Sequence, residues 1–386
     1  MRLLLLFPSE VRGGVEEHSL IIATAAVKQG WEVHAGFPQT TGLTSLIRDF
    51  RINGVSYHQL EIAETDAYES KKTRLLRLGR VATLLYRVRP DVVLMALSAP
   101  GRCLESMLAC RLLKIPAAVI FHSFPFPISF TRRRLQVYAW ARTMKQQWIA
   151  VSDNTRKILC ESFQIPQDEV IRIYNCAKVT HTLNGDNQEN TLLLRRQVRQ
   201  ELGLSECCWV LLTVARLHPG KGYSNLLQTI PHIAKEFPNA IFVWAGEGEH
   251  KEHLLREIRE YGVEDKVLLL DHRSDTPRLM KAADLFILPT HYEGLPLTLL
   301  EAMTYHLPVV ISAVNGIPEV IQDKVHGLLC RAGDNCDLLE TIRWALRHPT
   351  AMREMARNAQ LRVRDFSEEG MVRETLDVLR RLGRIF

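Results

Sequence analysis

Residues 209–222 read WVLLTVARLHPGKG and contain a strand pattern, a loop and the start of a helical pattern. The first six residues are apolar or β-branched without alternation, which predicts a strand buried on both faces, as in a parallel sheet covered by helices. The helical pattern that follows runs over Gly222–Phe237. This order of elements predicts an α/β domain with a doubly wound parallel sheet.

Short apolar runs alternate with helical patterns on both sides of this stretch. In the second half of the chain the strand-like runs are Trp209–Val214, Ala240–Trp244, Lys266–Leu270, Leu285–Leu288 and Pro308–Ile311. In the first half they are Arg2–Phe7, Glu32–Gly36, Asp91–Ala96, Ala117–Phe121, Trp148–Val151 and Val170–Tyr174. Two tandem Rossmann-like, doubly wound α/β domains are the simplest explanation of this repetition.

A polar segment without apolar periodicity, HTLNGDNQEN over residues 181–190, separates the two sets of runs and is typical of a linker. We therefore expect a first domain over residues 1–180, a linker over 181–194 and a second domain over 195–366. The remaining segment, 367–386, carries one long amphipathic pattern over Ser367–Leu382. We expect this segment to form a helix that packs back on the first domain.

The composition is that of a globular protein. Of 386 residues, 46% are hydrophobic and 24% charged, which excludes a disordered or fibrous chain. The apolar runs are far shorter than the ~20 residues of a membrane-spanning helix, and Leu3–Phe7 is too short for a secretory signal. The eight cysteines form no C-x-x-C pair, so we expect no structural zinc site and reduced thiols in a cytosolic protein.

The formal net charge of +6 is unevenly distributed. Residues 68–145 contain 15 Lys and Arg against 3 Asp and Glu, whereas residues 191–386 contain 25 against 26. In and just after the basic stretch, two segments, residues 68–90 and 131–148, combine apolar side chains with basic ones. These segments fit helices on an anionic membrane surface, or helices that cover the sheet with solvated charges outside. No recognised nucleic-acid-binding module is present.

Three loops contain residues that could carry chemistry. The first, after the first strand, is Arg12-Gly13-Gly14-Val15-Glu16-Glu17-His18. Its glycines allow the backbone to approach a ligand, and a helix starting there offers free N–H groups to an anion. A plain tight turn is the alternative. The loop lacks G-x-G-x-x-G, which disfavours a nicotinamide or flavin cofactor.

The second loop places Arg216 and Lys221 on either side of a Pro-Gly turn, directly before a helix. Arginine offers a fork of donors to phosphate oxygens, lysine a compact positive charge, and the helix N-terminus a further partial positive charge. This combination predicts a diphosphate site built without a metal ion. A solvated surface loop with two basic residues is the alternative.

The third loop leads into a helix and carries Glu293 and Glu301, which are separated by seven residues. Pro296 fits the first helical turn, so Glu293 lies in the preceding loop and Glu301 inside an otherwise apolar helix. A carboxylate there requires hydrogen-bond donors, and sugar hydroxyls are such donors. A glutamate at a polar edge of the helix is the alternative.

Together these features resemble the GT-B glycosyltransferases, specifically family 4, the retaining group. The resemblance covers nearly the whole chain in the family's order: two α/β domains, the GG loop, R-x4-K and E-x7-E. Further matching pieces are Phe121-His122, Val151-Ser152, Tyr174-Asn175, Ala245–Gly248, Ala283-Asp284, Leu288-Pro289, Leu307–Val310 and Gly316–Glu319. The chain departs from the family pattern at Ser123, where Asp is frequent, and at His306 and Asp271, where Gly is common.

The resemblance implies a role for each matching residue. Arg216 and Lys221 would neutralise the diphosphate of the donor, Glu301 would hold the ribose hydroxyls, and Glu293 would meet hydroxyls of the transferred sugar. Further donor contacts would come from Gly13, Gly14, Glu247 and the backbone N–H groups of Gly294, Leu295 and Leu297. Glu16 and His122 would lie on the acceptor side, with His122 facing the reacting centre across the cleft between the domains.

The implied activity is that of a retaining hexosyltransferase. A sugar would move from a nucleotide-diphosphate donor, a UDP-sugar in preference to a GDP-sugar, to a lipid-linked, polysaccharide or other glycan acceptor, without metal or cofactor. We expect a cytoplasmic protein, peripheral on the inner membrane face through residues 68–90 and 131–148, with no nucleic-acid partner. Two alternatives stay open: a sugar-nucleotide epimerase of the same fold, and a non-catalytic protein that binds glycan or membrane.

Overall fold

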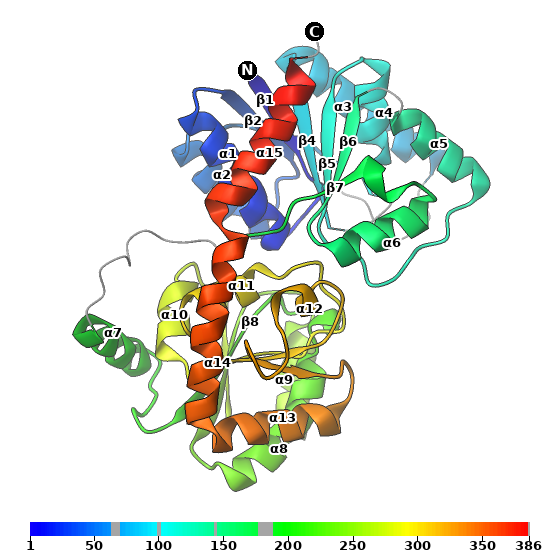
Figure 1. Ribbon diagram of the computed structural model, residues 1–386. Coiled ribbons are helices and arrows are strands. Elements are labelled where there is room, and N and C mark those ends of the chain that lie inside the picture. Colours follow the sequence, from blue (N-terminus) through cyan, green and yellow to red (C-terminus); the bar gives the residue numbers. More distant parts are fainter. Residues whose placement is uncertain (63–69, 99–101, 143–144, 177–187, 385–386) are drawn as a thin grey trace. The chain divides into compact units, whose positions relative to one another are not determined.

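The computed structural model describes residues 1–62, 70–98, 102–142, 145–176 and 188–384. The chain divides into two compact units, drawn in Figure 1. Unit 1 comprises Met1–Asn175 and Glu369–Phe386, and unit 2 comprises Cys176–Glu368. Each unit contains one parallel sheet with helices against it, which confirms the predicted fold class of two Rossmann-like α/β domains.

Unit 1 contains a seven-stranded sheet in the order β3-β2-β1-β4-β5-β6-β7, with parallel pairing throughout. The strands are β1 (Arg2–Leu6), β2 (Glu32–Phe37), β3 (Ser56–Gln59), β4 (Val92–Leu97), β5 (Ala117–Phe121), β6 (Gln146–Ala150) and β7 (Val170–Arg172). The helices are α1 (Gly14–Lys28), α2 (Thr44–Ile52), α3 (Lys71–Val88), α4 (Leu104–Leu112), α5 (Arg132–Arg142), α6 (Asp153–Phe163) and α15 (Glu368–Gly383).

The central strands of unit 1 are buried because helices cover both faces of the sheet. Every residue of β4 is buried, and α3, α4, α5 and α6 contribute to a shared core on one face. On the other face α1, α2 and α15 lie over the strands (Figure 1). Each fully buried Leu or Val contributes roughly 1.5–3 kcal/mol, so continuous apolar runs are stabilising only in such a two-sided environment.

The terminal helix α15 belongs to unit 1, where it packs beside the end of α1. Arg380 donates to the side-chain oxygen of Gln29, and its guanidinium lies 5.7 Å from the centre of the Trp31 ring. Leu376 and Leu379 are fully buried. The amphipathic period of the C-terminal sequence therefore corresponds to a helix that contacts residues more than 300 positions earlier in the chain.

Unit 2 contains a six-stranded parallel sheet in the order β10-β9-β8-β11-β12-β13. The strands are β8 (Trp209–Val214), β9 (Ala240–Ala245), β10 (Val267–Leu270), β11 (Leu285–Leu288), β12 (Val309–Ser312) and β13 (Leu328–Cys330). The helices are α7 (Gln188–Glu201), α8 (Tyr223–Glu236), α9 (Lys251–Glu260), α10 (Thr276–Ala282), α11 (Leu297–Thr304), α12 (Ile317–Val320), α13 (Asn335–Arg347) and α14 (Pro349–Arg362).

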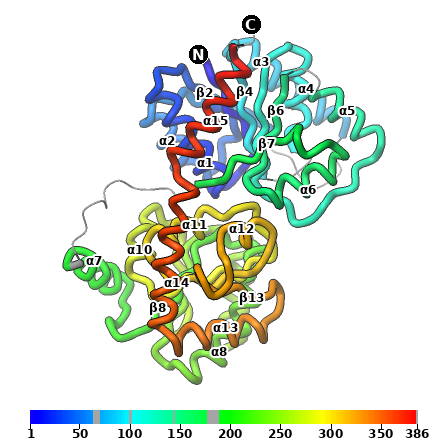
Figure 2. Tube along the Cα trace, viewed as in Figure 1, coloured from blue at the N-terminus to red at the C-terminus, as the bar shows by residue number. Residues whose placement is uncertain are grey.

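Buried ion pairs and side-chain amides tie the helices of unit 2 together. Helices α8 and α13 lie side by side, joined by a 2.7 Å hydrogen bond between Asn225 and Asn335 (Figure 2). Helix α7 is anchored by Arg199, which is 1% exposed and bonds Asp284 at 2.7 Å. Of the segment expected as a linker, residues 181–187 lie outside the described residues, and 188–194 form the first half of α7.

Among the residues that the structure describes, no helix combines the length and the apolar character needed to cross a membrane.

Candidate functional site

In unit 2 the candidate residues follow two neighbouring strands at the topological switch point of the sheet. The chain passes from β8 to β9 on one side and later returns to β11 on the other side of β8. In open α/β sheets ligands bind outside the carboxyl ends of the strands at such a point. Arg216 and Lys221 follow β8, and Glu293 follows β11.

The structure brings Lys221 and Glu293 together although they are 72 positions apart in the sequence. Lys221 Nζ donates to Glu293 Oε1 at 2.5 Å. The Glu293 side chain is 8% exposed and that of Lys221 22% exposed. Removal of water strengthens this ion pair, and it also makes either charge unfavourable without the other. The pair therefore holds a positive and a negative group ready at one position.

Backbone contacts fix the two loops to each other. Thr290 Oγ1 donates to the carbonyl of Gly220 at 3.0 Å, and the His291 N–H donates to the same carbonyl at 2.9 Å. At Gly222, where φ is +73°, a Cβ atom would lie 1.9 Å from the Pro289 carbonyl oxygen. A glycine is required there because of both the left-handed backbone and this close approach.

The turn that contains Lys221 is closed by a neutral histidine. His218 Nδ1 accepts the Gly220 N–H at 3.0 Å. Burial, assisted by the charge of Arg216, lowers the pKa of His218. His218 therefore acts as a helix cap, and the positive charges of this loop are those of Arg216, which is exposed, and Lys221.

Glu247 lies in the turn after β9, next to this loop, and its side chain is exposed. Its carbonyl accepts the Leu217 N–H at 2.9 Å. Cβ atoms at Gly246 and Gly248 would lie 2.0 Å from the Ala215 carbonyl oxygen and 2.2 Å from that of Leu217. The G-E-G sequence thus allows the turn to pack directly against the backbone around Arg216.

Helix α11 carries Glu301, which is half-buried. Gly294, Leu295 and Leu297 lie at its buried N-terminal end. The Glu293 N–H donates to Asn315 Oδ1 at 3.1 Å, a contact that the sequence pattern did not predict. Beyond the helix, His306 has a φ of +56°, the left-handed conformation that explains why glycine is common there in the family.

In unit 1 the remaining candidates gather where the strands end. Gly13 is the N-cap of α1, and a Cβ atom on it would lie 3.3 Å from Glu16 Oε2. Gly14 begins the helix, and Glu16 is 3% exposed in its first turn. Arg12 does not offer a free charge to a ligand, because it bonds Glu17 at 2.6 Å and Asp49 at 2.7 Å.

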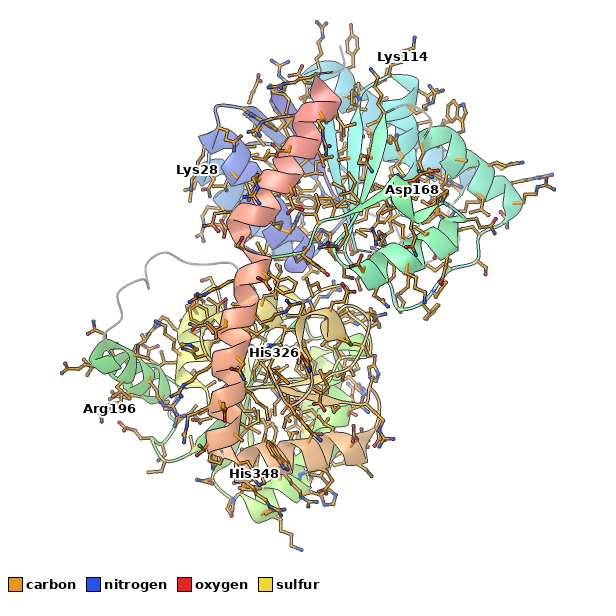
Figure 3. All side chains as sticks on the ribbon, in the orientation of Figure 1. Lys28, Lys114, Asp168, Arg196, His326 and His348 are labelled. Atoms are coloured by element: carbon orange, nitrogen blue, oxygen red, sulfur yellow. The ribbon has the colours of Figure 1, made fainter. Side chains whose placement is uncertain are left out.

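His122 follows β5 at the same edge and is 6% exposed. Its ring lies 4.7 Å, centre to centre, from that of His18 in α1, in an edge-to-face arrangement. Burial lowers the pKa of His18 to about 4, and burial together with His18 holds the pKa of His122 well below its usual value. Lys28 and Lys114, labelled in Figure 3, mark the opposite edge, because they precede β2 and β5.

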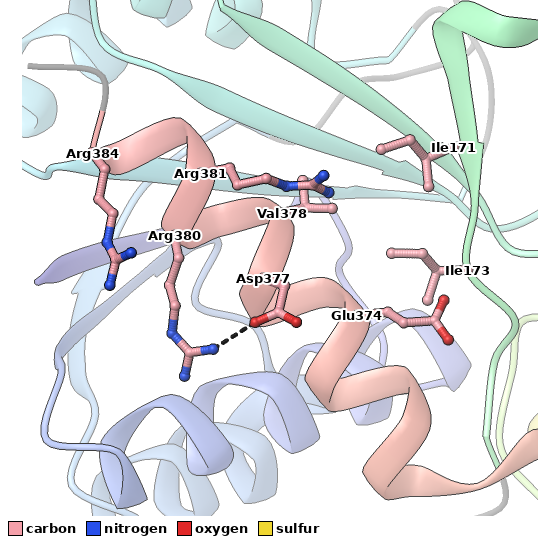
Figure 4. A pocket seen from close by; sticks show the side chains of 8 residues that line it. All are labelled: Ile171, Ile173, Glu374, Asp377, Val378, Arg380, Arg381 and Arg384. Carbon is pink, nitrogen blue, oxygen red and sulfur yellow. Dashed lines mark hydrogen bonds and ion pairs between the residues drawn. The ribbon is translucent and has the colours of Figure 1, made fainter.

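Two further features lie apart from these candidates. His250, His253 and Glu257 of unit 2 have ligand atoms within 4.8 Å of one another, a spacing at which they could hold a metal ion. In unit 1 a cavity of about 450 Å³ lies between β7 and α15 (Figure 4). Three arginines and two acids line it, and Arg380 bonds Asp377 there at 2.6 Å. None of the predicted site residues lines this cavity.

The basic segments divide between core and surface. In α3, Val81, Leu84 and Leu85 are buried against the sheet, whereas Leu75 and Leu76 are 69% and 54% exposed. Leu75 and Leu76 line a groove of about 890 Å³ between β3 and α3, together with Lys72, Arg80 and Arg87.

The second basic segment behaves similarly. In α5, Val137 and Trp140 are exposed beside three consecutive exposed arginines, Arg132–Arg134, while Trp148 is fully buried in β6. Residues 68–69 and 143–144 of these segments lie outside the described residues.

Each half of the chain matches a known protein family. Residues 12–180 match the family described as Glycosyltransferase Family 4, and residues 195–362 match the family described as Glycosyl transferases group 1. The two matches follow the order of the sequence motifs, the first covering unit 1 from residue 12 to its boundary at Asn175 and the second lying within unit 2. They contain every candidate residue discussed above.

Individual relatives and structures agree with these matches. An uncharacterized glycosyltransferase of Haemophilus influenzae is 24% identical over 95% of this chain and 96% of its own length. The UDP-Gal:α-D-GlcNAc-diphosphoundecaprenol α-1,3-galactosyltransferase of Escherichia coli is 27% identical over 65% of each chain. The crystal structure of Anabaena HepE in complex with UDP-glucose superposes with a TM-score of 0.80 at 20% identity, over 98% of this chain and 100% of that chain.

Proposed function

We propose a function from the premise that the chain belongs to glycosyltransferase family 4, has the GT-B fold and is a glycosyltransferase of the hexosyltransferase class. It transfers a hexosyl group from a UDP-sugar to a lipid-linked glycan acceptor, with retention of configuration. The observation that carries the proposal is the Lys221–Glu293 pair at the switch point of unit 2. In this pair the lysine offers a positive charge to a diphosphate, and the adjacent carboxylate accepts hydrogen bonds from sugar hydroxyls.

The charge of the departing group explains the role of the basic loop. When the bond between the sugar and the phosphate oxygen breaks, its electron pair goes to the diphosphate, and the sugar acquires oxocarbenium character. Fixed positive charge at Arg216 and Lys221 stabilises that transition state. The acceptor oxygen then bonds to the same face of the sugar, and its proton passes to the departing phosphate. In this proposal the two side chains take the place of a metal ion.

Two relatives support a uridine nucleotide and a lipid-linked acceptor. HepE was crystallised with UDP-glucose, and the E. coli relative is named for a UDP-galactose donor and a diphosphoundecaprenol-linked acceptor. In this chain Arg273 is held by Asp275 at 2.7 and 2.8 Å, and Asp271 bonds Lys251. Asp271, Arg273 and Asp275 follow β10 and would border the base of the nucleotide.

The donor assignment is tested with Glu301→Gln, assayed for transfer from UDP- and GDP-sugars. We expect wild type to use a UDP-sugar, and the variant to raise the donor KM about tenfold with kcat nearly unchanged, because a ribose contact is made equally in ground and transition states. Glu260→Gln, on an exposed position of α9, is the matched control. Epimerisation of the donor sugar without any acceptor would instead indicate an epimerase, and tight binding without turnover a non-catalytic protein.

We also propose that unit 1 contacts the cytoplasmic membrane face, where a lipid-linked acceptor would be found. Leu75 and Leu76 project beside Lys71 and Lys72 at the exposed start of α3. Apolar side chains flanked by cations fit the interface of an anionic bilayer, with the leucines among the acyl chains and the cations at the phosphates.

Membrane contact is tested by co-sedimentation with phosphatidylglycerol vesicles. We expect binding near 0.1 M salt and loss of most binding near 1 M, because the screening length falls from about 10 Å to about 3 Å. A Leu75→Glu/Leu76→Glu variant should bind weakly even at low salt. Ile52→Glu, which changes a 75% exposed apolar residue outside the basic segments, should bind as wild type does. Equal sedimentation of both variants would refute this surface.

A further inference from the structure

His18 is a buried histidine that neither the sequence motifs nor the family resemblance assigns to the reaction. It lies in the second turn of α1, is 2% exposed and meets the ring of His122 edge to face. Both residues belong to unit 1 and lie at the edge where its strands end. The partner in this contact is the residue that the family resemblance places at the reacting centre.

Each of the two rings has one buried nitrogen without a hydrogen-bond partner. These atoms are Nδ1 of His18 and Nε2 of His122. Another histidine pair in unit 1 behaves differently: His34 Nδ1 and His58 Nε2 bond each other at 2.9 Å. Buried polar atoms without partners are unfavourable, and native proteins retain them chiefly where a ligand or water completes the bonding.

The chemistry of the two rings determines which ligand group could bond to these two nitrogens. Burial keeps both imidazoles uncharged. A neutral imidazole offers one nitrogen as a donor and one as an acceptor, and a hydroxyl both donates and accepts. A phosphate or carboxylate only accepts hydrogen bonds, so it is a poor match for two neutral rings that present acceptor nitrogens as well as donors.

We propose that His18 and His122 form a subsite for one sugar hydroxyl, with His18 supplying the second ring nitrogen that holds it. The inference rests on the proposed function, because it takes both substrates of the reaction to be sugars. The hydroxyl comes from one of two sources, the transferred sugar of the donor or the sugar of the acceptor. In either case His18 binds the substrate and limits its orientation beside His122.

The test compares His18→Leu with His18→Asn, in steady-state kinetics with donor and acceptor varied separately. Leucine fills the space without a polar atom, whereas asparagine keeps one near the position of Nδ1. We expect His18→Leu to lower kcat/KM about tenfold for the substrate that supplies the hydroxyl, as expected for one lost hydrogen bond, and His18→Asn to recover most of it. A lower rate of donor hydrolysis without acceptor assigns the hydroxyl to the donor. A higher KM for the acceptor alone assigns it to the acceptor.

Control measurements separate this inference from folding and from the proposed function. His34→Leu alters the hydrogen-bonded histidine pair and should leave both KM values unchanged, and thermal denaturation shows whether each variant is folded. A folded His18→Leu enzyme with wild-type kinetics overturns the inference, and so does equal impairment by leucine and asparagine. An inactive wild-type protein overturns the proposed function, and this subsite with it.

Discussion

Replacement of Lys221 with methionine is expected to lower kcat/KM for transfer about a thousandfold, the effect of removing one preorganised group that stabilises transition-state charge. Methionine keeps the length of the side chain and removes its charge, so the loss reports the electrostatic contribution. The Lys221 ammonium bonds Glu293 at 2.5 Å, and both lie at the switch point between β8 and β11. The measurement is steady-state transfer with a saturating acceptor.

The same substitution should also destabilise unit 2. It leaves the carboxylate of Glu293, which is 8% exposed, without its partner, and breaking such a buried pair costs about 3 kcal/mol. A Lys221→Met/Glu293→Gln double variant removes the unpaired charge and should regain most of that stability. We expect it to remain inactive, since the positive charge at the diphosphate is still missing. Urea denaturation and activity measurements on both single variants and the double variant complete the cycle.

A matched lysine provides the control for this experiment. Lys266 is ion-paired to Asp265 at 3.1 Å and precedes β10, at the opposite edge of the sheet. Lys266→Met should retain full activity. If the double variant regained activity together with stability, Lys221 and Glu293 would be a structural pair, and the proposed role of Lys221 at the diphosphate would be wrong.

The strands that are continuous apolar runs could be predicted from the sequence, including β7 and β10 at sheet edges, whereas β3 and β13 at the other two edges could not. Strands β4 and β11 are continuous apolar runs because both faces are covered. Strand β3 reads SYHQ and lies at the edge of its sheet, where polar side chains are half solvated, so no apolar run marks it. Strand β13, Leu328–Cys330, is three residues long and is too short to show a period.

The candidate site shows the same division between local and long-range information. The residue types in the loops after β8 and β11 predict charge and hydrogen-bonding capacity because they are local in sequence. The pairing of Lys221 with Glu293 and the Asn315 contact depend on strand order, which brings distant loops together. His18 is the last residue of the first candidate loop in the sequence. The sequence does not show that it is buried, because its burial depends on the packing of the helix against the sheet.

The role of the basic stretch could not be predicted from the sequence, because some of its apolar residues are buried and others are exposed. A helical pattern with six apolar positions fits a membrane-facing helix and a core-facing helix equally well. In α3, Val81, Leu84 and Leu85 belong to the core, and Leu75 and Leu76 do not. Within α3 the surface available to a membrane is therefore the start of the helix, and the exposed apolar and basic residues of α5 offer a second such surface.

The free energy of unfolding should fall steeply as the pH is lowered from 7 to 5 in wild type, and less steeply in His18→Leu. Burial lowers the pKa of His18 to about 4, whereas an unfolded histidine has a pKa near 6.5. Above about pH 6.5 neither state binds the proton, and the contribution of His18 is constant. Below it the unfolded state takes up a proton that the folded state refuses, so stability is lost progressively until the pH reaches the folded pKa of about 4.

The expected size follows from the same two pKa values. Linkage gives a loss of about 2 kcal/mol between pH 7 and pH 5 from His18, and about 3 kcal/mol when the pH falls to 4. His122 adds to the loss, since its pKa is lowered in the same direction. Titratable groups other than these histidines contribute to both proteins alike, and the comparison with His18→Leu cancels their share. Parallel curves for the two proteins, measured by urea denaturation near pH 7 and pH 5, would show that His18 is protonated in the folded state and is not held neutral by burial.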